Sequence, residues 1–562
     1  MKNKFFVYQV FPRWFGNSNS TNKENGSIEE NGVGKFSAFD NKALKEIQKM
    51  GFTHIWYTGA LEHATKTDYS QYSIRKDHPD VVKGNAGSPY AIKDYYDVSP
   101  DLAENVEDRM KEFEALIERT HKLGMQVIID FVPNHTARQY HSDMKPDKVI
   151  DLGADDDQSM AFFADNNYYY MPGQKLELDF ATHQGDDAYI EFPAKATGND
   201  CFNNRPTIND WYETIKLNYG IDFNDNHTTH FTPIPDLWYK LRDILLYWVS
   251  KGVDGFRCDM AEMVPVEFWN WVIHSIKRKK KAITFIAEIY QPDQYHNFVN
   301  AGFDYLYDKV GLYDTLRDVI CGHRPTSDIT FCWQKLNGLE SNMLNFLENH
   351  DEQRIASDFF ASDPTKAIPG MIVSATMSTC PVMIYAGQEL GERGMDKEGF
   401  SGLDGRTTIF DYWSVESIRN WRNDGKFGTS KLTKEQIKLR KQYIQLLQIC
   451  NEEKAISEGN FFDLMYINYE NPEFDSTKIY AFLRSYKKES ILILTNFSDE
   501  AQNISVNIPD DAYAYMQISP EKIKSAKDLI SGKEIKIDYE WINSLRVDLT
   551  PYSGKIIKFS LT

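Results

Sequence analysis

Three acidic residues in this chain each come just after a short apolar run that has the composition of a β-strand. Asp259 follows GVDGFRC, Glu288 follows ITFIA and Asp351 follows MLNFLENH. Carboxylates are costly to bury, so they rarely end such runs by chance. If the three runs are neighbouring strands, three carboxylates meet at one place. Such an arrangement could cleave a glycosidic bond. In that reaction one carboxylate attacks the sugar, and a second, protonated carboxyl group donates its proton to the leaving oxygen.

The residues around two of these carboxylates predict different protonation states for them. Arg257 and Asp259 stand two positions apart on one predicted strand, so their side chains point the same way. A guanidinium there would lower the pKa of Asp259 and keep it ionised. Glu288 follows Phe-Ile-Ala, and an apolar setting raises the pKa of a carboxyl group and keeps its proton available. The alternative is a structural Arg–Asp ion pair and an exposed glutamate, but three such sites together favour catalysis.

The segments that would carry these side chains alternate between strands and helices. Runs rich in β-branched and aromatic residues predict eight strands: 5–11, 53–59, 126–132, 253–258, and the runs TFIAEI, FDYLY, NFLEN and PVMIYAG. Helical periodicity predicts helices at 41–50, 106–123 and 236–250, and one that begins at Thr433 with Gln436 as its capping-box partner. Such units point to an α/β fold of the (β/α)8 TIM-barrel type, with function at the carboxyl ends of the strands. A doubly wound open sheet competes, but no glycine-rich phosphate loop follows the first strand.

Two regions interrupt this alternation. Residues 136–232 are rich in Asp, Asn, Gly and Tyr with little periodicity, and they form a candidate inserted domain after the third strand. The last hundred residues are strand-like throughout, which predicts a C-terminal antiparallel β-sandwich. We therefore expect the first part of the barrel at 1–135, the insert at 136–232, the second part of the barrel at 233–455 and the sandwich at 456–562. Residues 16–32 contain few hydrophobic side chains and predict a flexible loop.

The composition limits the partners and the location. The chain has 63 Lys plus Arg against 82 Asp plus Glu, and its net charge of −19 would repel nucleic acids and anionic membranes, whereas an uncharged sugar polymer suits it. The six cysteines form no CxxC pair, so neither a metal site nor a disulfide framework is indicated, and no organic cofactor is expected. No run approaches membrane-spanning length and the N-terminal run does not fit a signal peptide, so we expect a cytoplasmic protein. The sequence carries no indication of the oligomeric state.

Four short motifs resemble those of a known family. DFVPNH (130–135), GFRCD (255–259), AEIY (287–290) and NHD (349–351) occur in the order and context of the four motifs of the α-amylase family, glycoside hydrolase family 13. IPDL (234–237) matches part of its fifth motif. The resemblance spans about residues 4–450, and the set is far more specific than a single GFRxD. It implies a (β/α)8 barrel, an inserted domain B after strand 3 and a β-sandwich domain C.

The resemblance also implies a role for each matching residue. Asp259 would be the nucleophile that forms a glucosyl-enzyme intermediate, Glu288 would protonate the leaving oxygen and then activate water, and Asp351 would hold the 2- and 3-hydroxyls of the sugar. Four further residues match sugar contacts of the family: His135 and His350 as hydrogen-bonding partners of one glucose, Arg257 as the residue that orients Asp259, and Tyr90 as the ring beneath the sugar.

Calcium is the one cofactor that the resemblance suggests. Asn134 and Asp236 match calcium positions of the family, and hard oxygen ligands suit that ion. The chain departs from the pattern at Glu262 and Met263, where many members carry Lys-His and the histidine binds calcium through its carbonyl oxygen. A backbone carbonyl does not require histidine, so we keep calcium as an expectation.

The aromatic residues of the insert have two interpretations. They could form walls that stack on sugar rings, because flat apolar faces pack well there. Packing inside the insert is the favoured interpretation, since these residues lie far in sequence from the predicted catalytic ones: Tyr168, Tyr169, Tyr170 and Trp211.

Three functions follow as hypotheses. The leading one is a retaining α-glucan hydrolase that cleaves α-1,4 bonds of starch or maltooligosaccharides. An α-glucanotransferase would use the same intermediate, with a sugar hydroxyl in place of water. A non-catalytic glucan-binding barrel is disfavoured because all three carboxylates are present. Ala91 stands where exo-acting α-glucosidases of the family carry aspartate, which favours cleavage inside a glucan chain.

Overall fold

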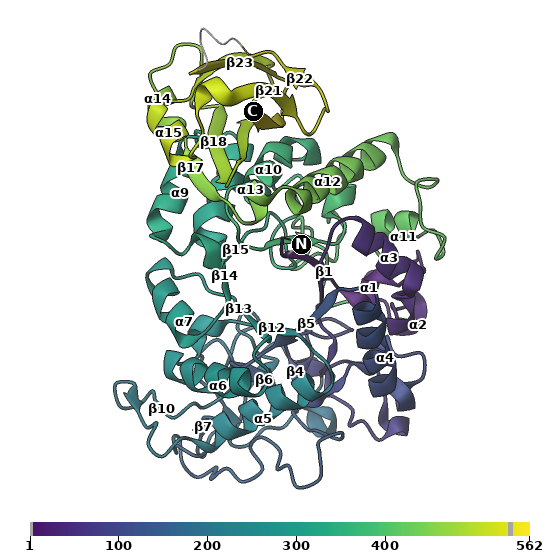
Figure 1. The fold of residues 1–562 in the computed structure, drawn as a ribbon. Helices are drawn as coiled ribbons and strands as arrows, with labels where there is room; N and C mark the ends of the chain where they lie inside the picture. Colours follow the sequence, from purple (N-terminus) through teal and green to yellow (C-terminus); the bar gives the residue numbers. More distant parts are fainter. Residues whose placement is uncertain (1–3, 538–542, 562) are drawn as a thin grey trace.

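The centre of the fold is a parallel eight-stranded sheet that curves into a barrel. We describe it from a computed structural model that covers residues 4–537 and 543–561 (Figure 1). The neighbours in the sheet follow the order β15–β14–β13–β12–β5–β2–β1–β16. Asn345 closes the ring, because its N–H donates to the Pro381 carbonyl and its own carbonyl accepts from the Met383 N–H. The barrel strands are β1 (Phe6–Val10), β2 (His54–Tyr57), β5 (Gln126–Phe131), β12 (Gly255–Cys258), β13 (Thr284–Ala287), β14 (Tyr305–Tyr307), β15 (Met343–Leu344) and β16 (Val382–Tyr385).

Side chains from alternate strand positions fill the barrel, so it is a packed core rather than a pore. The interior cluster consists of Val7, Trp56, Ile128, Ile286, Tyr307, Leu344, Phe346 and Met383 with their neighbours. Helices cover the outside through apolar stripes that face the strands. The longer helices are α3 (Asn41–Lys49), α4 (Arg109–Lys122), α5 (Asp236–Ser250), α6 (Val266–Lys279), α7 (Tyr295–Ala301), α8 (Asp314–Ile320), α9 (Asp328–Leu336), α10 (Ile368–Thr376), α11 (Glu416–Arg422) and α12 (Lys434–Glu452).

Local signals set the bounds of several helices. Helix α5 spans the predicted residues 236–250 and buries the stripe formed by Leu237, Leu241, Ile244, Leu245 and Trp248. Helix α12 starts after Thr433, whose side chain accepts from the Gln436 N–H while the Gln436 side chain accepts from the Thr433 N–H. The shorter helices are α1 (Pro12–Phe15), α2 (Ile28–Asn31), α13 (Lys454–Ser457), α14 (Met465–Asn468) and α15 (Asp510–Tyr515).

Between β5 and α5 the chain leaves the barrel and forms short strand pairs at the end opposite the C-terminus (Figure 1). The strands of this insert are β6 (His135–Ala137), β7 (Tyr170–Met171), β8 (Ala194–Lys195), β9 (Thr214–Lys216), β10 (Ile221–Asp222) and β11 (Thr228–Thr229). Their pairs are β6–β9, β7–β8 and β10–β11, all antiparallel. An antiparallel hairpin of β3 (Leu61–His63) and β4 (Ile92–Val98) follows β2 and lies beside β6.

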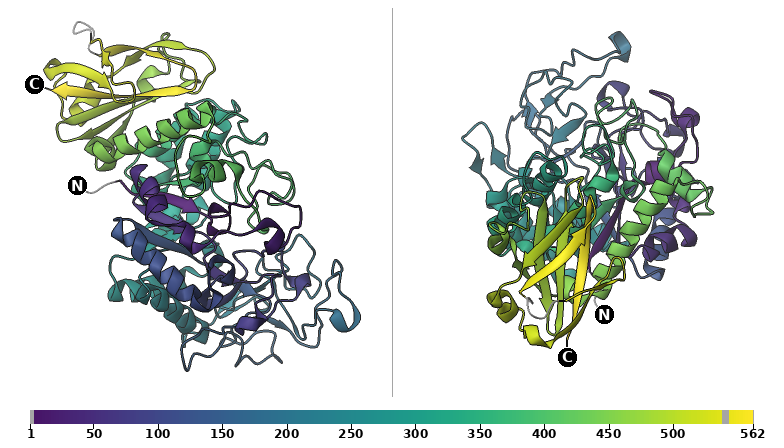
Figure 2. Two further views of the ribbon diagram at one scale, coloured as in Figure 1. Left: turned by 90° about the vertical axis from the view of Figure 1, so that its right-hand side faces the viewer. Right: turned by 90° about the horizontal axis from the view of Figure 1, so that it is seen from above.

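The C-terminal part is an antiparallel β-sandwich, as the sequence predicted. Its larger sheet has the order β17–β18–β19–β24–β21–β22, and its smaller sheet pairs β20 with β23. Figure 2 shows both sheets in yellow at one end of the molecule, where α10 packs against β19 and β24. The strands are β17 (Asn460–Asp463), β18 (Ile479–Tyr486), β19 (Glu489–Asn496), β20 (Gln502–Asn507), β21 (Ile523–Asp528), β22 (Glu534–Ile535), β23 (Ser544–Leu549) and β24 (Ser553–Leu561).

The structure differs from the sequence predictions in two segments near the barrel. The seventh strand, expected at NFLEN, is β15 at Met343–Leu344, and the chain then runs on without regular structure to Asp351. Residues 16–32 were expected to be a flexible loop, but buried asparagines attach them to the barrel. Asn17 Nδ2 donates to the carbonyls of Asn31 and Trp413, and the chain forms α2 there.

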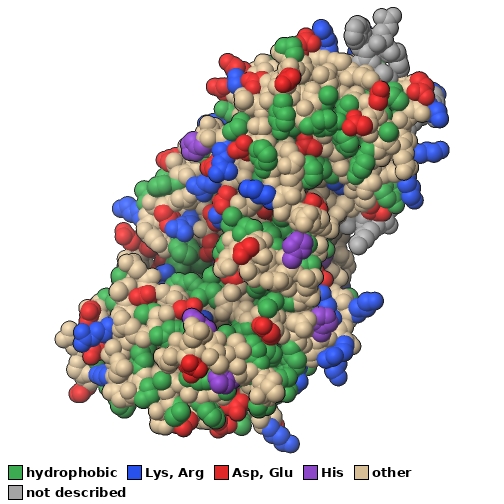
Figure 3. All heavy atoms as spheres, turned by 90° about the vertical axis from the view of Figure 1, so that its left-hand side faces the viewer, with side chains coloured by type: hydrophobic (Ala, Val, Ile, Leu, Met, Phe, Trp, Pro, Cys, Tyr) green, Lys and Arg blue, Asp and Glu red, His purple; other side chains and the backbone are tan. Residues whose placement is uncertain are grey.

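The surface drawn in Figure 3 carries acidic and basic side chains interspersed with one another. Within residues 4–537 and 543–561, every helix is too short or too polar to cross a lipid bilayer.

Candidate active site

Three predicted carboxylates lie at the carboxyl ends of barrel strands. Asp259 directly follows β12, Glu288 directly follows β13, and Asp351 lies on the segment after β15. Parallel strands end at the same rim of a barrel, which is where enzymes of this architecture place their chemistry. The three side chains line one pocket of about 190 Å³, together with Tyr90 and His135. Five of the residues predicted from sequence therefore share a single cavity.

Arg257 lies beneath this pocket and links the first two carboxylates. Its side chain is fully buried, with Nη1 2.6 Å from Asp259 Oδ1 and Nη2 2.7 Å from Glu288 Oε1. Its Nε donates to the Tyr307 hydroxyl at 3.2 Å, which fixes the plane of the guanidinium. The two carboxylates are thus neighbours across one rigid fork, since the guanidinium nitrogens keep a fixed geometry.

Glu288 has two further partners that hold its carboxyl group. The Met260 N–H donates to Oε2 at 2.7 Å, and the Tyr290 hydroxyl donates to Oε1 at 2.7 Å. Glu288 is almost completely buried. Its carboxyl group is therefore held by Met260, which follows the neighbouring strand β12, and by Tyr290, which lies on the loop after its own strand β13.

A chain of side-chain contacts leads to Asp351. His350 Nε2 lies 3.0 Å from Asp351 Oδ2 and is also within hydrogen-bond reach of the Tyr90 hydroxyl. Gln9 Nε2 lies 2.8 Å from His350 Nδ1. The rings of Tyr90 and His350 stack with their centroids 5.2 Å apart. Segments from distant parts of the sequence, one before β4 and one after β15, therefore bring Tyr90 and His350 to Asp351.

Comparison with known proteins shows the family of this barrel. The model of the catalytic domain of α-amylases matches residues 9–301, more than half of the 562 residues. The chain belongs to the α-amylase family. A second model, of the maltogenic amylase C-terminal domain, matches residues 472–556 in the sandwich. The resemblance found in the four short motifs is thereby confirmed for the family.

Individual members of the α-amylase family are only distantly similar to the chain. α-Amylase 3 of Dictyoglomus thermophilum is 22% identical over 491 residues, which cover 84% of this chain and 82% of that protein. The α-amylase of Geobacillus thermoleovorans, whose structure was solved with acarbose, has a TM-score of 0.64 at 18% identity, with 100% of this chain and 99% of that chain covered. A cyclomaltodextrin glucanotransferase with three domains reaches a TM-score of 0.66 at 16% identity, with both chains fully covered. These structures confirm the fold.

The electrostatics of Asp259 differ from the sequence prediction. Burial raises the pKa of Asp259 well above its ordinary value, although Arg257 lowers it, and the charge of Glu288 raises it further. The sequence suggested that the guanidinium would dominate, but it did not reveal how deeply the side chain is buried. Asp351 shows the opposite balance, because His350 and then Arg257 lower its pKa despite burial. Burial lowers the pKa of His135 to about 3, so this ring stays neutral.

Several residues of the site were missed by sequence reasoning. Asp130 lies inside the DFVPNH motif, and its Oδ2 accepts from Trp56 Nε1 and the Gly59 N–H. Its Oδ1 lies 3.7 Å from Arg257 Nη1. Tyr290, inside the AEIY motif, contacts Glu288. Both could have been found by applying the strand-end rule to every polar residue of the motifs.

Trp211 lies at the pocket rather than inside the insert. It lines the cavity, and its ring centroid is 5.3 Å from that of His135. The sequence interpretation favoured packing for Trp211 and for Tyr168–Tyr170, and only the three tyrosines are buried in that way. No sequence signal distinguishes Trp211, because its position depends on how the insert folds back over the barrel.

The residues expected to bind calcium are already held by lysine ammonium groups. Lys216 Nζ lies 2.8 Å from Asn134 Oδ1 and 2.5 Å from Asp200 Oδ1. Lys240 Nζ lies 2.9 Å from Asp236 Oδ2. A divalent cation beside either ammonium would be repelled, so this donor set as arranged does not fit calcium. Neither Asn134 nor Asp236 lines the pocket.

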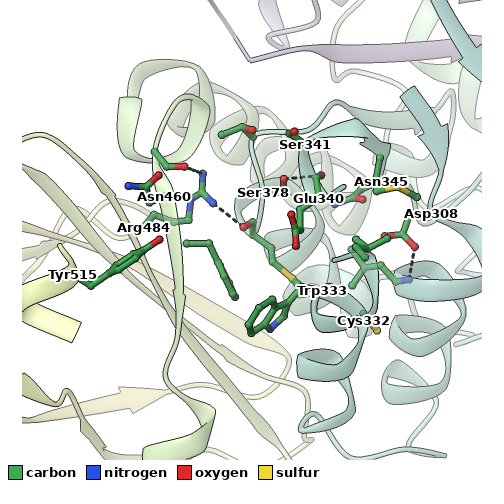
Figure 4. A pocket seen from close by; sticks show the side chains of 17 residues that line it. Asp308, Cys332, Trp333, Glu340, Ser341, Asn345, Ser378, Asn460, Arg484 and Tyr515 are labelled. Atoms are coloured by element: carbon green, nitrogen blue, oxygen red, sulfur yellow. Dashed lines mark hydrogen bonds between the residues drawn. The ribbon is translucent and has the colours of Figure 1, made fainter. Parts of the chain in front are cut away.

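A second pocket of about 330 Å³ lies between the barrel and the sandwich (Figure 4). The close-up shows Arg484, Asn460 and Tyr515 on the sandwich side and Trp333 and Asp308 on the barrel side. Arg484 donates to four backbone carbonyls there, which joins the two parts. The lining of this pocket includes none of the three predicted catalytic carboxylates.

Proposed function

We propose that this protein is a retaining α-glucan hydrolase that cleaves α-1,4-glucosidic bonds of starch or maltooligosaccharides. The observation that carries the proposal is the pairing of Asp259 and Glu288 in one pocket across a single guanidinium. Retaining glycosidases need two carboxyl groups about 5 Å apart on the reacting bond. Family membership adds support, because relatives such as α-amylase 3 of Dictyoglomus thermophilum are named for this activity.

The reaction proceeds in two displacements. Asp259 attacks the anomeric carbon, and the bond to the leaving oxygen breaks while Glu288 donates its proton to that oxygen. The glucosyl group is then held as an ester of Asp259. Glu288, now ionised, takes a proton from water, and the resulting hydroxide attacks the anomeric carbon and releases Asp259. Each displacement inverts the anomeric centre, so the product keeps the α configuration.

The hydrogen bonds of Glu288 leave room for the proton that the first step needs. A carboxylate offers about four lone-pair sites. Met260 occupies one on Oε2 and Tyr290 occupies one on Oε1, while Arg257 Nη2 lies 2.7 Å from Oε1 as an ion-pair partner. The remaining site on Oε2 can carry the transferable proton. Burial raises the pKa of Asp259, and Arg257 opposes that rise and so favours the ionised form that the attack needs.

Side chains around the pair suit the binding of a sugar ring. Tyr90 offers an aromatic face at the pocket, and Asp351 offers a carboxylate whose pKa is held low, so it can accept from two sugar hydroxyls. Neutral His135 can donate one hydrogen bond and accept another. Phe400, Phe410 and Trp211 form apolar walls for neighbouring sugars.

The second candidate is an α-glucanotransferase, which a specific finding favours. The structure of a cyclomaltodextrin glucanotransferase covers the whole chain with a TM-score of 0.66. Digestion of maltoheptaose separates the two functions. A hydrolase releases only shorter chains, with the α anomer formed first as seen by NMR. Products longer than maltoheptaose would contradict the hydrolase assignment, and initial release of the β anomer would contradict retention.

A binding barrel without catalysis is the remaining hypothesis. It predicts that maltoheptaose binds and stays intact, whereas the presence of all three carboxylates in one cavity supports turnover. We also propose the division into barrel (1–135 and 233–455), insert (136–232) and sandwich (456–562). The departure of the chain after β5 and its return at α5 support this division. Calcium has no step in the proposed mechanism, because the family's calcium position is held by lysines in this chain.

A further inference from the structure

Four carboxylates outside the pocket converge where the β3–β4 hairpin meets the start of the insert. Glu62 lies on β3, Asp94 and Asp97 lie on β4, and Asp143 lies on the insert. Each residue has one carboxylate oxygen that lies within 4.8 Å of such an oxygen on each of the other three. Glu62, Asp94 and Asp97 are almost completely buried, and Asp143 is partly exposed. We call these four residues the acidic cluster.

Glu62 is the member that indicates a ligand. Among the described residues, neither oxygen of its carboxyl group has a hydrogen-bond partner, although Glu62 is only 1% exposed. The nearest cation is Lys93, whose Nζ is 4.0 Å from Oε1, beyond hydrogen-bond reach, and which instead contacts Asp77 at 3.0 Å. A buried carboxylate without hydrogen bonds is costly, so it needs a partner that the side chains do not supply.

The other three members are held in place by the surrounding chain. Asp94 accepts from the Tyr96 and Met144 N–H groups and from the Ser142 hydroxyl. Arg109 contacts both Asp97 and Asp143, at 2.5 and 3.1 Å. One guanidinium for the pair leaves the cluster with an excess of negative charge.

We propose that the acidic cluster binds one Ca²⁺ ion. Calcium takes about six to eight oxygen ligands, carboxylates among them, whereas Mg²⁺ keeps several waters and usually binds through one or two carboxylates. Four carboxylate oxygens that lie within 4.8 Å of one another therefore suit Ca²⁺. Bound there, the ion joins the β3–β4 hairpin to the first residues of the insert. The chain just before β4 carries Tyr90, so the ion also stabilises one wall of the pocket.

Calorimetric titration of the EGTA-dialysed full-length protein with CaCl₂ tests this proposal. The expected result is one ion per chain and a melting temperature that rises with calcium concentration. Glu62→Gln keeps the size of the side chain and removes its charge, and it should weaken calcium binding at least about 100-fold. The matched control is Asp200→Asn. Asp200 contacts Lys216, the lysine that occupies the family's calcium position, so this variant should bind calcium as tightly as the wild type does.

Stability without calcium provides a second readout that does not depend on activity. In EGTA, Glu62→Gln should melt at or above the temperature of the wild type, because the unpaired buried charge is gone. In excess calcium the order should reverse. Failure of the wild type to bind calcium would overturn the proposal, and so would loss of binding in Asp200→Asn with retention in Glu62→Gln. In either case the activity on maltoheptaose would remain a separate question.

Discussion

At the scale of single residues, Arg257 determines the geometry of the proposed catalytic pair. Its two terminal nitrogens contact Asp259 and Glu288, and its Nε is fixed by Tyr307. A lysine at this position offers one ammonium in place of a planar fork and cannot hold both carboxylates at once. The distance between nucleophile and acid then becomes variable, which affects the transition state more than the binding of substrate.

We therefore predict that Arg257→Lys lowers kcat on maltoheptaose by roughly 100-fold or more, while KM changes little. Steady-state kinetics check this, with Arg119→Lys as a control because Arg119 donates to the backbone carbonyls of Phe39 and Phe36, away from the pocket. Equal loss in both variants would point to a general loss of stability. An unchanged kcat in Arg257→Lys would show that the guanidinium does not position the pair.

The residue scale also shows how far sequence reasoning reached. Asp259, Glu288 and Asp351 could be placed in one cavity because each directly follows an apolar run or a family motif. The pKa direction of Asp259 could not be predicted, because it depends on burial by residues from several strands. The contact between Lys216 and Asn134 could not be predicted either, since Lys216 lies more than 80 positions after Asn134 and meets it through the pairing of β6 with β9.

At the scale of elements, the accuracy of the predictions follows the strength of the local signals. Helix α5 matched its predicted bounds because an apolar stripe and a terminal glycine define it. The strand expected at NFLEN was displaced because its polar side chains bind the backbone. Glu348 accepts from the Ile355 N–H, and Asn349 Oδ1 accepts from the N–H groups of Asp351 and Glu352. Such bonds compete with the ladder of a sheet.

The insert is attached to the end of β5 through a buried ammonium. Lys216 on β9 contacts Asn134 and Asp200, and its side chain is 5% exposed. Lys216→Met should lower the stability by about 3 kcal/mol, because it leaves polar groups without a partner in a buried setting. Differential scanning calorimetry measures the change. Lys195→Met is the control, since the Lys195 ammonium on β8 makes only weak contacts among the described residues, 3.8 Å from Glu191 and 5.8 Å from the centroid of the Tyr170 ring. A variant as stable as the control would contradict the role of Lys216.

At the scale of the whole molecule, buried histidines make the fold sensitive to acid. Burial lowers the pKa of His54, His63 and His135 to about 3 in each case. The folded protein keeps these rings neutral, whereas the unfolded chain binds protons below pH 6.5 or so. Their contribution to stability is complete above the unfolded pKa and is lost as the pH falls from about 6.5 towards 3.

We predict that the free energy of unfolding falls between pH 6 and 4 by up to about 1.4 kcal/mol per pH unit for each of these histidines. His54→Gln removes one of these histidines, so the free energy of unfolding should fall less steeply with decreasing pH, by the contribution of one proton to the slope. Urea unfolding at several pH values measures this. His274→Gln serves as the control, because His274 is exposed on α6. An identical pH dependence in the wild type and His54→Gln would show that His54 does not resist protonation.

The central claim is that Asp259 forms a covalent bond to the sugar. Glu288→Gln removes the general acid and base. Fluoride leaves α-maltotriosyl fluoride without being protonated, so the first displacement still occurs in this variant. The second displacement needs a general base and is therefore slow. Intact-protein mass spectrometry should then show the mass of one maltotriosyl group, and peptide mapping should place it on Asp259. Asp259→Asn should show no adduct. An adduct on another residue, or none in Glu288→Gln while the fluoride is consumed, would contradict the account.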